Sequence, residues 1–230
     1  MNAKKEHEKK DIWLVIAAYK EEKKIGSVLS SLQQKGYQNI IVVDDGSSDA
    51  TATVAENAGA IVLRHIVNRG QGAALQTGID FALQQDAEII VTFDADGQHQ
   101  ATEIKNLTAL IENKEAEACL GSRFLEIKSN IPWHRKFLLK GGAFLMWLFY
   151  GIAVTDSHNG FRAFSRNAAQ KLHITADRME HASEILEQIA KQNISYKEIP
   201  VTITYTDYSL QKGQSSFAAF SILWNMIKNK

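Results

Sequence analysis

The chain has 230 residues, and 45% of them are hydrophobic, which is enough apolar material for one α/β domain of ordinary size. Lys+Arg and Asp+Glu each total 26, so the formal net charge is zero and no general basic field is available to hold nucleic acid. The single cysteine, Cys119, excludes an internal disulfide framework and is expected to be a buried thiol.

Residues 1–10 are strongly charged and contain no apolar segment, so we expect a flexible tail and no secretory signal. Together with the lone cysteine, this favours a cytoplasmic protein. The longest apolar run, from Ala143 to Val154, has about a dozen residues, short of the ~20 that a membrane-spanning helix needs. Cations precede it, so the segment 135–154 is predicted either to pack in the core or to lie on the cytoplasmic face of a membrane as an interfacial helix.

The first elements alternate between strand and helix. Ile12 to Tyr19 form a continuous apolar run, typical of a strand buried on both faces, and a helical apolar pattern follows from Ile25 until Gly36. Further strands are predicted at 39–45, 60–66 and 87–94, with helices at 49–59 and 72–85 between them. This alternation predicts a mostly parallel sheet, with ligands bound at the carboxyl ends of the strands.

The second half of the sequence is less regular. We expect a helix over Thr102 to Glu112, a strand at 117–124 that runs into a loop, and an apolar helix at 135–151. A helix at 182–193, one or two strands at 194–206 and a closing helix at 215–229 complete the chain.

The sequence IIVVDDGSSDAT places Asp44 and Asp45 at the end of a strand. A capped strand-to-helix turn, with Ser48 or Asp49 as the N-cap, explains the later part of this motif. It does not explain the adjacent aspartates, because only one can point outward and the other must find backbone amides or a ligand hydroxyl. In an open α/β sheet this position faces a bound ribose or base.

The sequence NRGQGAALQTG places Arg69, Gly70 and Gly72 at the start of a helix. By itself an ordinary glycine-containing helix start is the favoured interpretation, because short glycine patterns are weak signals. Arg69 is expected at the same edge as Asp45 and Asp94, which raises the alternative of an anion contact at a helix amino terminus.

The sequence VTFDADGQHQ is the strongest signal. If the strand stays extended through Asp96, Asp94 and Asp96 lie on the same side, and their repulsion requires either a proton or a cation between them. Mg²⁺ or Mn²⁺ takes carboxylate oxygens and commonly shares its coordination with substrate phosphates, and Gln98 offers a further oxygen. The alternative is an acidic turn that caps the next helix.

Five motifs in this order and spacing, IAAYKE, VVDDGSSDAT, FDADGQH, GSRF and DSHNGFRAF, resemble the family 2 inverting glycosyltransferases. Within this family the chain looks most like the branch that transfers sugars to polyprenyl phosphates (dolichyl or undecaprenyl phosphate), and the resemblance covers nearly the whole chain. It implies a single-domain GT-A fold over residues 11–230, with a Rossmann-like, mostly parallel sheet flanked by helices. Residues 11–100 would bind the nucleotide sugar, and residues 101–230 would form the acceptor side.

The resemblance also implies roles for individual residues. The donor nucleotide sugar (UDP- or GDP-linked) would contact Ala17, Tyr19, Glu21, Val43, Asp45, Arg69, Asp94, Ala95 and Asp96. A divalent metal, Mg²⁺ or Mn²⁺, would bind Asp94, Asp96 and Gln98. Arg123 would contact phosphate, and Asp156 and Arg162 would lie on the acceptor side, where we also expect Arg162 to meet an anion.

Two parts of the chain depart from the family pattern. The first motif usually reads PAYNE, and this chain has Ala17 and Lys20 at the proline and asparagine positions. The late loop of dolichyl-phosphate mannosyltransferases carries an arginine and a lysine where this chain has Leu210 and Ser216, and Lys212 is the cation nearby. These departures put the positioning of the base and a mannose donor in doubt.

The charge of the acceptor decides the chemistry that the chain must supply. Negative charge develops on the departing nucleotide, and a metal at Asp96 together with Arg123 and Lys212 would stabilise it. A lipid phosphate needs no general base, whereas a glycan hydroxyl does. For that case Glu184 and His181 are the candidates by type. A solvated helix face is the alternative for both, and the favoured one for His181.

Two rival functions remain. FDADGQ also resembles the haloacid-dehalogenase phosphatase motif, in which the first aspartate, here Asp94, would be a nucleophile, but that motif usually lies on the first strand. The other rival is a nucleotide-sugar-binding protein that has lost catalysis, an alternative kept open by the atypical late loop. The predicted function is a metal-dependent inverting glycosyltransferase acting on a lipid phosphate, with a soluble family 2 enzyme acting on a glycan hydroxyl as a further alternative. The sequence leaves the oligomeric state open.

Overall fold

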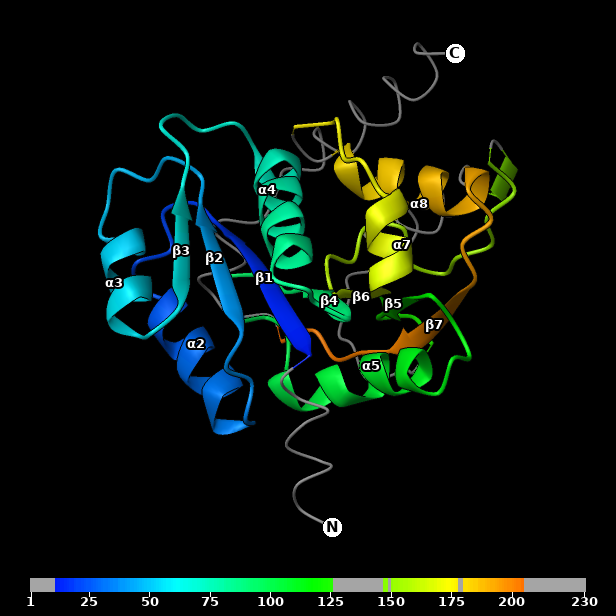
Figure 1. Cartoon of the computed structure of the whole chain (residues 1–230), viewed down its shortest axis with the longest axis horizontal. Coiled ribbons are helices and arrows are strands. Elements are labelled where there is room, and N and C mark those ends of the chain that lie inside the picture. The colour runs from blue at the N-terminus through cyan, green and yellow to red at the C-terminus, as the bar shows by residue number, and fades with distance from the viewer. Residues whose placement is uncertain (1–10, 126–146, 149, 178–179, 205–230) are drawn as a thin grey trace.

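The computed structural model describes residues 11–125, 147–148, 150–177 and 180–204, and its described strands form one sheet (Figure 1). The strand order is β3-β2-β1-β4-β6-β5-β7. Their bounds are β1 Ile12–Ala18, β2 Ile40–Asp44, β3 Ile61–Arg64, β4 Ile89–Thr92, β5 Ala118–Ser122, β6 Arg162–Ser165 and β7 Tyr196–Pro200.

Helices cover both faces of this sheet, as Figure 1 shows. Because side chains alternate along a strand, Leu14 and Ile16 of β1 pack into one core cluster and Val15 into the other. The first cluster includes α2 (Ile25–Gln34), α3 (Thr51–Asn57) and α5 (Ile104–Glu112), which follows the short 3₁₀ helix η1 (Ala101–Glu103). The second includes α4 (Gln71–Gln84), α7 (Arg166–Lys171) and α8 (His181–Lys191).

Helix α4 packs directly on β1 because it carries a glycine at the contact. A Cβ at Gly78 would lie 2.3 Å from Cγ1 of Val15, a separation that real atoms do not adopt. The glycine therefore allows the helix to lie close to the sheet.

The direction of the strands gathers the motifs at one edge. β1 pairs in parallel with β2 and β4, whereas β6 runs antiparallel to both β4 and β5. The carboxyl ends of β1, β2, β4 and β5 therefore lie at the same edge as the amino end of β6. We call this the carboxyl edge, and it is the edge at which an α/β sheet binds ligands.

The strand–helix alternation predicted from the sequence is confirmed for the first half of the chain, and the strand at Ala118–Ser122 and the helix of residues 182–193 are confirmed in the second half. Cys119 is fully buried, and burial raises the pKa of its thiol to about 12, as expected of a core thiol. The sequence analysis missed the antiparallel strand β6 and the short helix α7.

Several expectations lie outside the described residues: the tail 1–10, most of the segment 135–154, and the closing helix. Of the apolar segment the structure describes residues 147–148 and 150–154, and the side chains of Trp147 and Leu148 are 55% and 54% exposed. Among the helices that the structure describes, none combines the length and apolar character needed to cross a bilayer.

Candidate active site

The loop after β2 is held by Asp45, whose carboxylate is almost fully buried. It accepts hydrogen bonds from the backbone amides of Arg69 (2.9 Å) and Gly70 (2.7 Å), and it lies 2.7 Å from Nδ1 of His65. Asp45 thus joins the carboxyl end of β2 to the start of α4. Its predicted contact with the donor remains a prediction.

Neither of the two aspartates points outward, contrary to the sequence analysis, but the expectation that a carboxylate finds backbone amides is confirmed. Asp44 is fully buried, accepts a hydrogen bond from the amide of Ser47 (3.2 Å) and lies 3.3 Å from Nε of Arg64. Both carboxylates find protein partners because the turn after β2 and the neighbouring strand β3 surround them.

The first loop of the carboxyl edge follows β1. Tyr19 is 42% exposed, whereas Glu21 is buried and its amide donates to Oγ1 of Thr51. Lys20, between them, has φ 55°, in the left-handed region that asparagine tolerates better than lysine. This backbone requirement explains why the related motif carries asparagine at that position.

The remaining donor residues divide between core and surface. Val43 has no exposed surface and packs in the core beneath α4, so a contact with a donor would run through its backbone. Ala17 is partly buried and Ala95 is buried, while Arg69 is exposed on the loop before α4.

The aspartate pair after β4 does not lie on an extended strand, contrary to the sequence analysis. β4 ends at Thr92, and the residues that follow form a turn in which Gly97 has φ 75°. The pairing with the antiparallel strand β6 also ends there, since Thr92 pairs with Arg162, the first residue of β6. The two carboxylates are still close enough for the charge of Asp94 to raise the pKa of Asp96.

His99 holds Asp94 in place. Its Nε2 lies 2.7 Å from Oδ2 of Asp94, and its buried ring packs against Phe93 and Phe161 at centroid distances of 5.5 and 4.9 Å. Burial opposes ionisation of Asp94, but the neighbouring His99, followed by His181 and Arg123, lowers its pKa below the ordinary value. Asp94 is therefore a carboxylate with a fixed orientation.

A second contact limits the movement of Asp94. A Cβ at Gly160, two residues before β6, would lie 2.7 Å from Oδ1 of Asp94, and Nε2 of Gln71 donates to the same oxygen over 3.3 Å. The NGF sequence of the late motif thus leaves room for the carboxylate of the DAD motif.

The pKa of Asp96 is shifted in the opposite direction to that of Asp94. Burial raises its pKa to about 6, and the charges of Asp94 and Glu21 add to the rise, although the amide of Gln98 donates to its Oδ1 over 2.9 Å. An ionised Asp96 therefore lacks sufficient positive charge from the protein. A divalent cation would supply it.

The donor set fits a hard cation that is shared with a substrate. Asp94, Asp96 and Gln98 offer carboxylate and amide oxygens, the ligands that Mg²⁺ and Mn²⁺ prefer. Within the described part of the chain, no three His, Cys, Asp or Glu side chains come together as a complete metal site. The residues present thus suit an ion whose remaining ligands come from a diphosphate and water.

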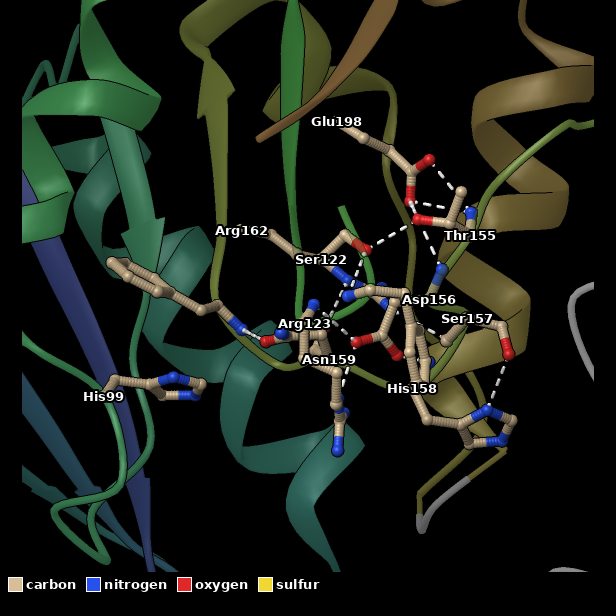
Figure 2. Close-up of polar contacts among 12 residues, drawn as sticks. His99, Ser122, Arg123, Thr155, Asp156, Ser157, His158, Asn159, Arg162 and Glu198 are labelled. Atoms are coloured by element: carbon tan, nitrogen blue, oxygen red, sulfur yellow. Dashed lines mark hydrogen bonds and ion pairs between the residues drawn. The ribbon is translucent and has the colours of Figure 1, made fainter. Parts of the chain in front are cut away.

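Arg123 follows β5 and is fixed by Asp156. Its Nε lies 2.6 Å from Oδ2 of Asp156, and its backbone amide donates to the same oxygen over 3.2 Å. Figure 2 shows these two residues beside the turn that leads to Asn159. Asp156 is therefore a structural counterion for Arg123, and its predicted place on the acceptor side remains a prediction.

Arg162 is 3% exposed, and its guanidinium donates hydrogen bonds to backbone carbonyls. Its Nε donates to the carbonyl of Asn159 over 2.9 Å, and its Nη2 donates to the carbonyls of Ser157 (3.2 Å) and Ala182 (3.1 Å). This arrangement ties the turn before β6 to α8. It gives Arg162 a structural task that the sequence analysis did not foresee, and its contact with an acceptor anion stays a prediction.

Both candidate general bases lie on α8, and their catalytic role stays a prediction. The carboxylate of Glu184 accepts hydrogen bonds from the amides of Thr175 (3.0 Å) and Ala176 (2.9 Å), so it fixes the preceding loop. His181 is 4% exposed, so its favoured placement on a solvated helix face is wrong. It is buried because α8 packs on the start of α4, where a Cβ at Gly72 would lie 2.8 Å from Cβ of His181.

The late loop with Leu210, Lys212 and Ser216 lies outside the described residues. Sequence reasoning also missed three residues that shape the site: His65, His99 and Glu198. His99 could have been found, because a histidine that follows an acidic motif within one turn is a natural partner for it. Glu198 gives no such signal in the sequence.

Comparison with known proteins agrees with this geometry. Residues 13–173 match the family model described as Glycosyl transferase family 2. The chain belongs to glycosyl transferase family 2. It is therefore an enzyme of the glycosyltransferase class, as the five motifs predicted.

Two relatives align over nearly the whole family 2 chain. One is an uncharacterised protein of Methanocaldococcus jannaschii, 41% identical over 96% of this chain and 93% of its own. The other is the UDP-N-acetylglucosamine–dolichyl-phosphate N-acetylglucosaminyltransferase of Methanococcus voltae, 36% identical over 95% of this chain and 96% of its own.

Among solved structures, glucosyl-3-phosphoglycerate synthase of Mycobacterium tuberculosis in complex with Mn²⁺ and UDP-glucose is similar in fold. The TM-score is 0.72 at 17% identity, covering 99% of this chain and 81% of the other. The predicted GT-A fold is thereby confirmed.

Proposed function

We propose that the enzyme transfers a sugar from a nucleotide-sugar donor to a polyprenyl phosphate, with inversion at the anomeric carbon. The observation that carries this proposal is the aspartate pair at the carboxyl edge. Asp94 is held by His99, and burial together with the charge of Asp94 raises the pKa of Asp96 to about 6. The name of the Methanococcus voltae relative supports the same donor and acceptor classes.

On the donor side, Asp96, Asp94 and Gln98 would hold Mg²⁺ or Mn²⁺ against the diphosphate. The bound ion supplies positive charge that stabilises the departing nucleotide. Tyr19, Glu21 and the loop fastened by Asp45 would surround the base and ribose, beside the exposed Arg69. A UDP-linked donor is favoured, since the 36% identical relative is named for UDP-N-acetylglucosamine.

Arg123 would contact phosphate and, with Lys212 of the late loop, would stabilise the departing nucleotide, while Asp156 and Arg162 would lie behind it on the acceptor side. The fixed ion pair between Arg123 and Asp156, 2.6 Å long, supports this role because the guanidinium is already ordered before a phosphate arrives.

The state of α8 favours a phosphate acceptor over a glycan hydroxyl. A hydroxyl needs a general base, and the carboxylate of Glu184 already accepts hydrogen bonds from the amides of Thr175 and Ala176. A lipid phosphate is already an anion and attacks without one. We propose that catalysis takes place at the cytoplasmic face of a membrane, a location supported by the exposed apolar side chains of Trp147 and Leu148.

A transfer assay tests the proposal. The protein is incubated with Mn²⁺, dolichyl or undecaprenyl phosphate in detergent, and one labelled donor at a time: UDP-N-acetylglucosamine, UDP-glucose or GDP-mannose. We expect one donor to label the lipid phosphate, with loss of the product in EDTA. Nucleotide binding without transfer to either lipid would instead support the non-catalytic alternative, and release of phosphate from a phosphomonoester would support the phosphatase.

A further inference from the structure

Glu198 lies on β7, the edge strand of the sheet, and its half-buried carboxylate is turned toward the loop before the DSHNGF motif (Figure 2). Its two oxygens accept hydrogen bonds from the backbone amide of Thr155 at 2.8 and 2.9 Å. The hydroxyl of Thr155 donates over 3.0 Å and the amide of Asp156 over 3.2 Å. One carboxylate thus collects three donors from two consecutive residues.

The contact continues from this loop to Arg123. Oδ2 of Asp156 accepts from both Nε and the amide of Arg123, at 2.6 and 3.2 Å. Asp156 is only 2% exposed, so its packed side chain can move only together with the backbone of its loop. Glu198 therefore fixes the backbone of Asp156, and the side chain of Asp156 fixes Arg123.

A second connection runs through hydroxyl groups. Oγ of Ser122 lies 2.6 Å from Oγ1 of Thr155, and it accepts the amide of Phe124 over 3.2 Å. Because the Thr155 hydroxyl gives its only proton to Glu198, the Ser122 hydroxyl donates to Thr155. The residues on both sides of Arg123 are thereby tied to the same carboxylate.

Burial makes this a costly way to attach a loop. Burial raises the pKa of Glu198, and the charge of Asp156 adds to the rise, although the hydrogen bonds from Thr155 and Asp156 lower it. An apolar side chain would pack a loop on β7 without this cost. What the carboxylate adds is direction, because its lone pairs define where the amides of residues 155 and 156 must lie.

We propose that Glu198 is a positioning residue that sets the place of the Arg123 guanidinium in the phosphate-binding part of the site, acting through Thr155 and Asp156. The inference rests on the proposed function, in which Arg123 contacts a phosphate of the donor or acceptor. Glu198 itself does not touch the substrate.

The chain offers a matched control at the opposite end of β5 and β7. Glu117, just before β5, accepts hydrogen bonds from the amide of Ser195 (3.3 Å) and from Nδ2 of Asn167. It is thus also a carboxylate that fastens a neighbouring segment. Its contacts lie at the amino end of β5, a full strand away from Arg123.

The test is a double-mutant cycle. kcat/KM for transfer is measured for wild type, Glu198→Gln, Arg123→Ala and the double variant, with Glu117→Gln as control. We expect Glu198→Gln to lower kcat/KM about tenfold, the usual order for a residue that orients a functional group. Glu117→Gln should change it less than about twofold. In the Arg123→Ala background, Glu198→Gln should cost less than about twofold, because its effect runs through Arg123.

The same cycle is repeated on the dissociation constants of UDP and of farnesyl phosphate, measured calorimetrically, and on the melting temperature. A merely structural role predicts an additive cycle and a loss that follows the melting temperature, and this result would overturn the inference. If wild type binds either ligand but transfers no sugar, the proposed function fails, and coupling in the binding cycle still decides the role of Glu198.

Discussion

The donor side and the acceptor side of the carboxyl edge differ in how well the protein neutralises their charged side chains. On the acceptor side Arg123 pairs with Asp156 at 2.6 Å and Arg162 donates to three backbone carbonyls. On the donor side Asp96 carries a pKa raised to about 6 by burial and by neighbouring carboxylates. The acceptor side is arranged to hold cationic groups still, whereas the donor side has a deficit of positive charge that a ligand must fill.

Loss of the Asp96 carboxylate should have the largest effect on sugar transfer. Asp96→Ala is expected to lower sugar transfer roughly a thousandfold, because the metal loses the carboxylate that needs it most and the leaving nucleotide loses Lewis-acid stabilisation. Asp86→Ala is the control, since that side chain is 89% exposed and pairs with Arg166 before β4, away from the carboxyl edge. If Asp96→Ala transfers sugar at a rate within a few fold of wild type, Asp96 does not hold a metal that transfer requires.

Gly160→Ala tests the contact between Gly160 on the acceptor side and the carboxylate of Asp94 on the donor side. A Cβ at this position would lie 2.7 Å from Oδ1 of Asp94, so the carboxylate must leave the orientation that His99 gives it. We expect kcat/KM to fall about 10- to 100-fold, with a change in melting temperature of a few degrees at most. Unchanged kinetics in a folded variant would mean that the orientation of Asp94 is not needed for transfer.

Asp96→Asn tests the electrostatic contrast without a substrate. The folded pKa of about 6 lies above that of an unfolded aspartate, so protonation favours the folded state. Ionised Asp96 therefore lowers the stability of the metal-free protein above about pH 6, and this penalty fades as the pH falls toward 4.

Removal of the charge should stabilise the EDTA-treated protein by about 1 kcal/mol at pH 7.5, or roughly 2–4 °C in melting temperature. At pH 4 the gain should be absent. Calorimetric scans at both values check this, and a gain that is equal at the two pH values would assign it to packing instead of charge.

The smallest effect concerns the first loop of the donor side. Lys20 has φ 55°, so Lys20→Asn should raise the free energy of unfolding by about 0.5 kcal/mol, offset in part by the loss of the contact between its ammonium and the Tyr19 ring. Denaturant titration measures the difference. Lys23→Asn, in the same exposed turn, is the control and should give no gain.

The two sides also differ in how far the sequence predicts them. The donor side consists of short motifs that directly follow β1, β2 and β4, and parallel pairing brings their ends together, so Tyr19, Asp45 and Asp94 could be placed at one edge in advance. What failed there was local geometry. β4 ends at Thr92, and a period of two therefore does not reach Asp96.

The acceptor side depends on long-range pairing that no local pattern shows. β6 has four residues and lies between β4 and β5, which brings Gly160 to Asp94 and Asp156 to Arg123. Without this strand, Arg162 is expected to meet an anion on the acceptor side, and Glu198 is one residue of a predicted strand. Both acquire their partners only when the sheet order is known.

Thermal shift with UDP and GDP, with and without Mn²⁺, for wild type and Asp96→Ala tests whether a metal and a nucleotide share the site at Asp96. We predict that nucleotide and Mn²⁺ together raise the melting temperature of wild type by several degrees, more than the sum of their separate effects, since each ligand completes the site of the other. Asp96→Ala should lose this synergy. Stabilisation by nucleotide that is the same without Mn²⁺ and in Asp96→Ala would show that Asp96 does not hold a metal against the nucleotide.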